Sequence, residues 1–158
     1  MTLAIKPAPV KKSVSVKATP ERAFAVFTGR FDAWWPRSHS IGESPLKEAV
    51  IEGRAGGRWY GRLENCVEAD WGDVLAWEPP RRLLLAWRIG TDWKYDPDLL
   101  TEVEVTFTPE VGGATRVELE HRGLEAYAAR TDEMRGSFGG PGGWPGLLDR
   151  LAQAVEAR

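Results

Sequence analysis

The chain has 158 residues, of which 42% are apolar and 28% charged, which suits one globular domain over residues 1–158 with its core at about 10–157. The formal net charge is −2, from 21 basic and 23 acidic residues, and basic clusters such as Arg81-Arg82 are too small for a nucleic-acid stripe, which argues against a nucleic-acid partner. No run approaches the roughly 20 apolar residues of a membrane helix and no apolar leader segment opens the chain, so we expect no membrane span and a cytoplasmic location.

Residues 10–18 alternate apolar and polar side chains, which predicts a short half-buried strand. Thr19-Pro20 then supplies an N-cap and a first helical residue. Apolar side chains recur on one face of a helix that ends near Gly29, and a short turn over 31–35 precedes a polar loop at 36–47. The sequence therefore predicts two short helices between the first two strands.

Strand signals at hairpin spacing follow. They cover residues 48–53, 57–65, 70–78, 82–90, 101–108 and 115–121. Gly-Gly, acidic and Pro-Pro turns separate several of them, and the last two alternate most clearly between an apolar and a glutamate-rich face. Seven strands with one solvated face predict an antiparallel sheet.

The C-terminal part has a different period. Residues 124–134 allow a short helix or an ordered loop, and the glycine-rich segment 136–146 is expected to break any helix. An apolar stripe from Trp144 to Val155 then predicts an amphipathic helix that covers the apolar face of the sheet. The fold class is α+β.

Five strings carry a likeness to a known superfamily. They are residues 18–24 (ATPERAF), 56–59 (GGRW), 77–83 (WEPPRRL, with Trp87), 119–124 (LEHRGL) and 143–151 (GWPGLLDRL). From about residue 10 onward the chain resembles the helix-grip, START-like superfamily (SRPBCC) of the major birch pollen allergen. Within it, the chain is similar to bacterial homologues of the activator of heat-shock protein 90 ATPase. The resemblance implies a curved seven-stranded antiparallel sheet wrapped around a long C-terminal helix, commonly with a hydrophobic cavity between them.

The eight tryptophans are either the material of a packed core or the wall of such a cavity. Small Gly61, placed between large inward neighbours, favours the cavity. We expect the loops at 36–47 and 91–99 to flank one end of the sheet. The predicted lining consists of Trp35, Trp59, Trp77, Trp87, Val105, Phe107, Leu119, His121, Trp144, Leu148 and Leu151.

Few polar residues are candidates for chemistry. His121 shares the inward face of its strand, either as a core histidine bonded to the backbone or, by hypothesis, as a polar contact at the cavity mouth. Asp73 is either a buried carboxylate or, as neighbouring Gly72 favours, a residue at a wet edge. His39 is expected on the surface. The single Cys66 excludes an internal disulfide and a multi-cysteine zinc site, so we predict no catalytic or metal-binding residues and no cofactor.

The leading hypothesis is a small soluble, non-enzymatic carrier or sensor that encloses an apolar, aromatic or lipid-like molecule. The resemblance implies a second function, a chaperone ATPase activator or stress-response module with a chaperone or other protein as partner. A third is a cofactor-free cyclase, dehydratase or hydrolase with His121 and a carboxylate as acid and base. A homodimer is compatible with each of them.

Overall fold

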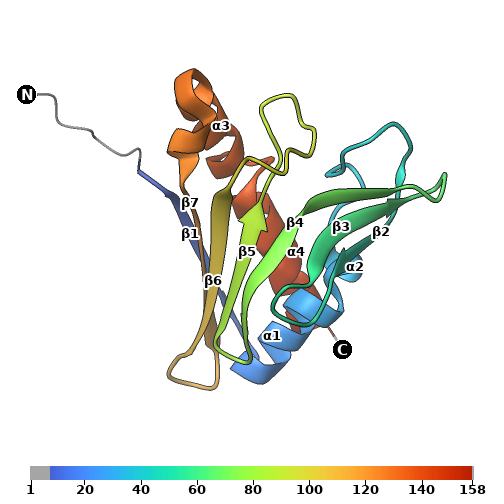
Figure 1. Cartoon of the computed structure of the whole chain (residues 1–158). Coiled ribbons are helices and arrows are strands. Elements are labelled where there is room, and N and C mark those ends of the chain that lie inside the picture. The colour runs from blue at the N-terminus through green and yellow to red at the C-terminus, as the bar shows by residue number, and fades with distance from the viewer. Residues whose placement is uncertain (1–7, 158) are drawn as a thin grey trace, which may run out of the picture.

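The computed structural model describes residues 8–157 and confirms the predicted α+β helix-grip architecture (Figure 1). The strands are β1 (Val10–Val16), β2 (Leu46–Ile51), β3 (Arg58–Leu63), β4 (Glu68–Glu78), β5 (Arg82–Trp87), β6 (Thr101–Pro109) and β7 (Thr115–Arg122). The helices are α1 (Pro20–Gly29), α2 (Phe31–Trp34), α3 (Thr131–Gly139) and α4 (Trp144–Glu156), with a 3₁₀ segment η1 (Leu124–Arg130) before α3.

All seven strands belong to one antiparallel sheet in the order β1-β7-β6-β5-β4-β3-β2. The first strand therefore pairs with the last, in a register that joins Val10 to His121 and Val16 to Thr115. The sheet curls around α4, which packs with α1 and α2 on its inner face (Figure 1). The predicted cover for the apolar face is confirmed.

Helix α1 begins as its sequence predicts. The Thr19 hydroxyl accepts a hydrogen bond from the backbone N–H of Arg22 at 3.2 Å, and Pro20 occupies the first turn, where its missing N–H costs no helical hydrogen bond. The apolar face of α1 turns Phe24 and Phe27 onto Phe107 of β6, with ring centroids 5.2 and 5.9 Å apart. These rings fill the interior near the middle of the sheet.

Strand β4 departs from simple alternation. Its register with β3 shifts between the pairs Trp59–Gly72 and Tyr60–Asp70, so Trp71 is an extra residue and the side-chain parity reverses after it. Val74 is therefore buried and Leu75 exposed, although strict alternation from Trp71 would place Asp73 and Leu75 inward. Asp73 is neither a buried carboxylate nor a residue at a strand edge: it lies within β4 on the outer face of the sheet and pairs with Arg88 at 2.7 Å.

One expectation about glycines held only in part and another was wrong. The glycine-rich segment does interrupt the helix between Gly139 and Trp144, but α3 runs through Gly136 to Gly139, because its buried side chains Met134 and Phe138 hold it to the core and outweigh the helix cost of glycine, about 1 kcal/mol. Gly61 borders no empty space, since a Cβ there would lie 2.8 Å from Leu46 and 3.0 Å from Trp71.

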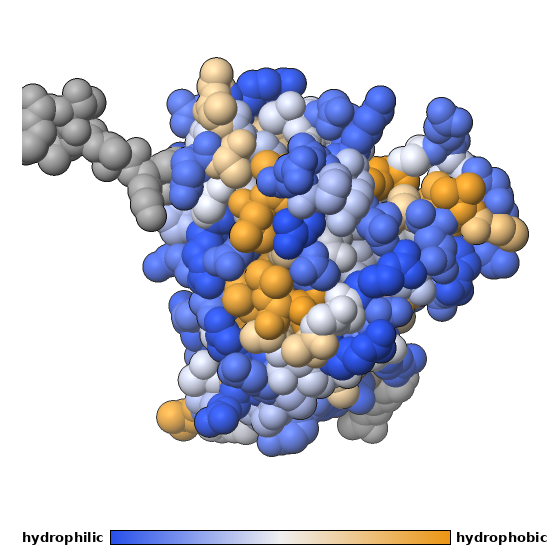
Figure 2. All heavy atoms as spheres, in the orientation of Figure 1, coloured by the Kyte–Doolittle hydropathy of each residue, from blue (hydrophilic) through white to orange (hydrophobic). Residues whose placement is uncertain are grey.

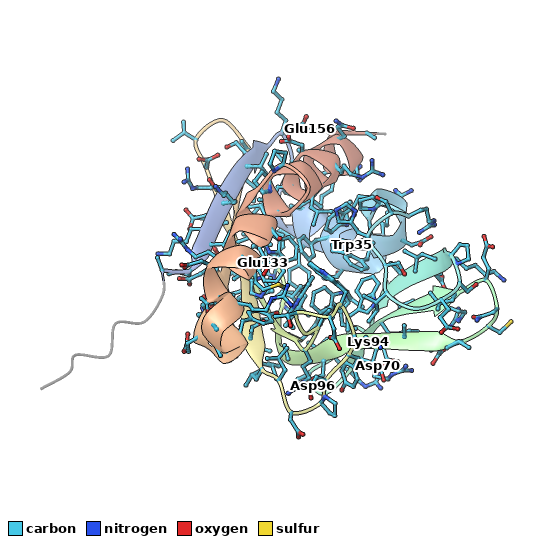
Figure 3. The ribbon with its side chains drawn as sticks, turned by 90° about the horizontal axis from the view of Figure 1, so that it is seen from above. Trp35, Asp70, Lys94, Asp96, Glu133 and Glu156 are labelled. Atoms are coloured by element: carbon cyan, nitrogen blue, oxygen red, sulfur yellow. The ribbon has the colours of Figure 1, made fainter. Side chains whose placement is uncertain are left out.

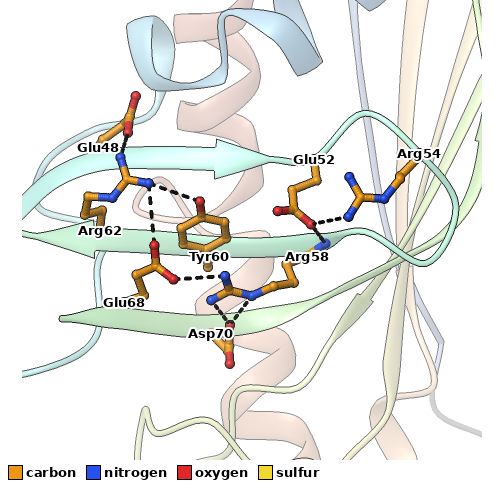
Figure 4. A network of polar contacts seen from close by, with 8 residues as sticks. All are labelled: Glu48, Glu52, Arg54, Arg58, Tyr60, Arg62, Glu68 and Asp70. Atoms are coloured by element: carbon orange, nitrogen blue, oxygen red, sulfur yellow. Dashed lines mark hydrogen bonds and ion pairs between the residues drawn. The ribbon is translucent and has the colours of Figure 1, made fainter. Parts of the chain in front are cut away.

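The outer face of the sheet is polar. Figure 2 shows a mostly hydrophilic surface on this side with separate small apolar spots. Across β3 and β4, Arg58 pairs with Glu68 at 2.9 Å and with Asp70 at 2.8 Å, and its guanidinium lies 4.1 Å from the centroid of Tyr60 (Figure 4). Solvent screens such exposed pairs, so they mark a solvated face rather than a major source of stability.

Within residues 8–157, no helix is long and apolar enough to cross a membrane. The same residues contain no group of three or more His, Cys, Asp or Glu side chains placed to hold a metal ion.

Candidate functional site

A cavity of about 570 Å³ opens at one end of the molecule. Its wall is made by the loop after α2, the loop between β5 and β6, and the segment that joins α3 to α4. The two loops therefore flank one end of the sheet, as expected. The volume lies within the roughly 300–1,000 Å³ typical of small-molecule sites.

Aromatic rings form most of this wall. Five of the eight tryptophans line it together with Phe138: Trp35, Trp71, Trp87, Trp93 and Trp144. Figure 3, which looks onto this end, shows Trp35 pointing into the interior and Asp96 at the periphery. The rings brace one another, with centroids 5.4 Å apart for Trp35 and Trp71 and 5.9 Å apart for Trp87 and Trp144. The wall is thus a rigid aromatic surface.

The predicted lining residues fall into three places. Trp35, Trp87 and Trp144 line the cavity. Trp77 lines a separate groove beside Pro79-Pro80. The others are buried in the packed interior and do not reach the cavity: Trp59, Val105, Phe107, Leu119, His121, Leu148 and Leu151. The cavity does not extend along the sheet because the phenylalanines of α1 occupy that space.

His121 is fully buried, away from the cavity mouth. Trp144 Nε1 donates to His121 Nδ1 at 3.1 Å, so the neutral imidazole carries its proton on Nε2. That N–H faces the Thr101 hydroxyl at 2.9 Å, and Thr101 in turn donates to the carbonyl of Trp87 at 2.9 Å. Burial lowers the pKa of His121 to about 3.

The hydrogen bonds that join Trp144, His121 and Thr101 change the expected role of this histidine. Both ring nitrogens are bonded to side chains rather than to the backbone, and neither contacts a carboxylate. His121 thus has no free nitrogen for acid–base chemistry. The acid–base pair of His121 with a carboxylate does not exist, and this histidine ties α4 to the sheet.

His39 is the functional candidate that sequence reasoning missed. Its ring lines the cavity, with Nδ1 at 3.0 Å from Ser38 Oγ and Nε2 at 2.7 Å from the carbonyl oxygen of Gly142. The indole of Trp35 donates to the His39 carbonyl at 2.7 Å and fixes the loop. The decisive partner is 103 positions away in the chain, so no local pattern indicated it.

The polar groups of the cavity are few. Of the lining residues that the structure describes, His39 alone has a titratable side chain, and Ser38, Ser40 and Ser137 supply hydroxyls. The indole nitrogens of Trp71 and Trp87 have no hydrogen-bond partner among the described residues, but both atoms are buried. Polar contacts to a ligand would therefore come from the histidine and the serines.

Comparison with known proteins gives a family and a fold. Residues 17–156 match the family described as Activator of Hsp90 ATPase homolog 1-like protein. No curated protein matches the chain.

Several solved structures are similar over almost the full length. An anthrahydroquino-Gama-pyrone synthase, Txn09, is 37% identical with a TM-score of 0.65, over 94% of this chain and 97% of that one. The self-sacrificing resistance protein CalC from Micromonospora echinospora is 30% identical with a TM-score of 0.70, over 94% of both chains. A protein from Mesorhizobium loti, 22% identical with a TM-score of 0.64 over 92% of this chain and 96% of that one, shares the fold.

Proposed function

Since this chain belongs to the Activator of Hsp90 ATPase homolog 1-like family and has its ligand-binding type of fold, we propose that it binds a flat, multi-ring aromatic molecule in its cavity. The observation that carries the proposal is the wall of five indoles around a space of about 570 Å³. Aromatic side chains bind other rings by stacking and edge-to-face contact, each pair adding about 0.5–1.5 kcal/mol beyond burial. A flexible alkyl chain would gain no such contacts.

The shape of the site favours rings as well. Trp35 and Trp71 line the cavity with their ring centroids 5.4 Å apart, and the buried side chains between the sheet and α4, such as Leu151, do not line it. A long lipid would need space between the sheet and α4, whereas a compact planar molecule would not. The name of the 37% identical synthase describes a fused aromatic compound, and this supports extending a ligand of that class to the present chain.

The protein-interaction alternative has less support. A docking module predicts a contiguous exposed apolar patch. Of the exposed large apolar residues, Trp93, Tyr95 and Leu100 lie on the β5–β6 loop, where Trp93 also lines the cavity, and Val67, Leu75 and Val111 lie singly on other elements. The observations thus favour a small molecule over a protein partner.

Tryptophan fluorescence tests the proposal directly. The protein is titrated with anthraquinone-2-sulfonate and flavone as planar ligands and with dodecanoate as a linear one. We expect saturable quenching at micromolar concentration by the planar compounds and a much weaker effect of dodecanoate. The variant Trp77→Phe removes an indole outside the cavity and should keep the same affinity. No saturable response to planar compounds, or tighter binding of dodecanoate, would overturn the proposal.

A further inference from the structure

Three groups on one side of the cavity form a hydrogen-bonded line. Ser38 Oγ lies 3.0 Å from His39 Nδ1, and His39 Nε2 lies 2.7 Å from the Gly142 carbonyl oxygen. All three residues line the cavity. A hydroxyl, an imidazole and a fixed acceptor in this order are the parts of a proton-accepting site.

The direction of the bonds follows from chemistry. A carbonyl oxygen can only accept, so the Gly142 contact places a proton on Nε2 of His39. Nδ1 is then a lone-pair acceptor, and the Ser38 hydroxyl donates to it. The lone pairs of Ser38 Oγ remain able to accept. The next donor in the line would be a hydroxyl of a molecule in the cavity.

The surroundings leave His39 without a competing base. No Asp, Glu, Lys or Arg occurs among the described residues that line the cavity. The neighbouring Arg37 and Asp32 form an ion pair with each other, with 2.7 Å between Arg37 Nη1 and Asp32 Oδ1. The ring of Trp35 packs on the imidazole with centroids 6.1 Å apart and an interplanar angle of 81°. His39 is therefore the one ionisable side chain among the described lining residues that can take up a proton released in this part of the cavity.

We propose that Ser38 and His39 accept the proton of a phenol or enol hydroxyl on the aromatic ligand, an inference that rests on the proposed function. The ligand O–H bond breaks and its electron pair stays on the oxygen. The proton goes to Ser38 Oγ while the proton of Ser38 goes to His39 Nδ1. The Gly142 carbonyl holds the resulting imidazolium through Nε2–H. The phenolate or enolate so formed is a nucleophile for addition or ring closure.

The sign of the ligand's pKa shift distinguishes this site from a passive aromatic cavity. Removal from water disfavours the charged form, so aromatic walls alone raise the pKa of a bound phenol. A base in hydrogen-bonded contact stabilises the ionised pair and lowers it. Binding and proton transfer can thus be measured separately on one ligand.

The probe is 7-hydroxycoumarin, whose phenol and phenolate forms have different excitation spectra, with 7-methoxycoumarin as a control that cannot ionise. Quenching of tryptophan emission measures the binding of both. We expect the wild-type protein to bind both compounds and to increase the acid dissociation constant of bound 7-hydroxycoumarin by about ten-fold. His39→Gln keeps an N–H donor for Gly142 and cannot take a proton. It should still bind both coumarins, but the phenol's pKa should then rise above that of the free compound.

The outcomes separate the two proposals. If both coumarins bind but the phenol's pKa is raised in the wild type, or is lowered equally in His39→Gln, the proton-accepting site is refuted and the binding function stands. If neither coumarin binds in the wild type, both proposals fail. A lowered pKa in the wild type that is lost in His39→Gln, with 7-methoxycoumarin bound equally by both proteins, supports the assignment.

Discussion

Trp144 donates its indole N–H to Nδ1 of His121 over 3.1 Å and so joins the first residue of α4 to the inner face of β7. The hydrogen bond fixes more than one helix end. It sets the tautomer of the imidazole, which in turn sets the direction of the bonds through Thr101 to the carbonyl of Trp87. Four residues from β5, β6, β7 and α4 are thereby held in one arrangement, which requires a neutral histidine.

This requirement predicts an acid-sensitive fold. The pKa of His121 is about 3 in the folded protein, against an ordinary value of 6.5. Below pH 6.5 the unfolded chain takes up a proton on this residue and the folded chain does not. The free energy of unfolding should thus fall by up to about 1.4 kcal/mol per pH unit as the pH drops from about 6 to 3. Urea unfolding at a series of pH values measures the slope.

The control for this slope is His121→Gln, which lacks the titrating group. The variant is expected to be less stable at pH 7, and the difference from the wild type should shrink as the pH falls. A constant difference between pH 6 and pH 3 would contradict the assigned pKa.

The hydroxyl of Thr101 gives a second prediction. Thr101→Val keeps the shape but leaves the carbonyl of Trp87 and Nε2–H of His121 without this partner. We expect a loss of about 1–3 kcal/mol in the free energy of unfolding, measured by denaturant titration. Thr106→Val, half-buried on the same strand, should change stability by less than about 0.5 kcal/mol. Equal losses in the two variants would show that the buried hydrogen bonds of Thr101 add nothing to the free energy of unfolding.

Trp93 offers a test of the cavity wall. Its side chain lies on the loop between β5 and β6, is 46% exposed and lines the cavity. Trp93→Ala should weaken binding of a planar ligand by about ten-fold, through lost ring contact, with little effect on stability. Tyr95→Ala removes an exposed ring from the same loop but outside the cavity and should bind as the wild type does. Calorimetric titration gives both affinities, and identical losses would argue for a loop effect.

Ser38 is expected to relay the proton. In Ser38→Ala, the imidazole of His39 keeps its bond to Gly142, but the hydroxyl between the ligand and Nδ1 is gone. The phenolate fraction of bound 7-hydroxycoumarin should fall at least several-fold, roughly in line with a lost proton-transfer partner. Ser40→Ala removes a cavity hydroxyl that contacts the Ile41 carbonyl instead, and the fraction should remain unchanged. Excitation spectra at pH 7 compare the two variants, and a smaller effect of Ser38→Ala than of Ser40→Ala would exclude the relay.

Gly136 and Gly123 should respond oppositely to alanine. A Cβ at Gly136 of α3 meets open space, so Gly136→Ala should raise the free energy of unfolding by about 0.5–1 kcal/mol through helix propensity. Gly123 has a φ of 79°, where an L side chain is strained, and Gly123→Ala should cost about 1–2 kcal/mol. Thermal unfolding ranks the two variants against the wild type. A destabilised Gly136→Ala would mean that α3 is held in a non-helical geometry.

The sequence predicted the fold well because its strongest signals were local and periodic. Alternation over β6 and β7, the Thr19-Pro20 helix start and the apolar stripe of α4 all lie where the structure has these elements. Alternation failed in β4, because the bulge at Trp71 depends on pairing with β3 rather than on the residues themselves. The extension of α3 to Gly139 was missed because burial of Phe138 overrides the glycines around it.

The candidate site was harder to predict for the same reason. Trp35, Trp87 and Trp144 were recognisable as inward-facing rings. The alternation of side chains along a strand, however, does not indicate at which end of the sheet a cavity remains. The space near Phe107 is closed by side chains of α1, which lies far away in sequence. The bond of His39 to Gly142 likewise exists only after α3 and α4 have docked.

The pairing of β1 with β7 also determines when the sheet can form in full during synthesis. Val10 pairs with His121, and β7 is the only strand beside β1 over the described residues. On the ribosome, at about 5–20 residues per second, the N-terminal strand would wait on the order of ten seconds before its partner has been synthesised. Throughout that interval the backbone N–H and C=O groups of β1 have no partner strand in the sheet. A cell that makes this protein must keep this open strand from pairing elsewhere until β7 has been synthesised.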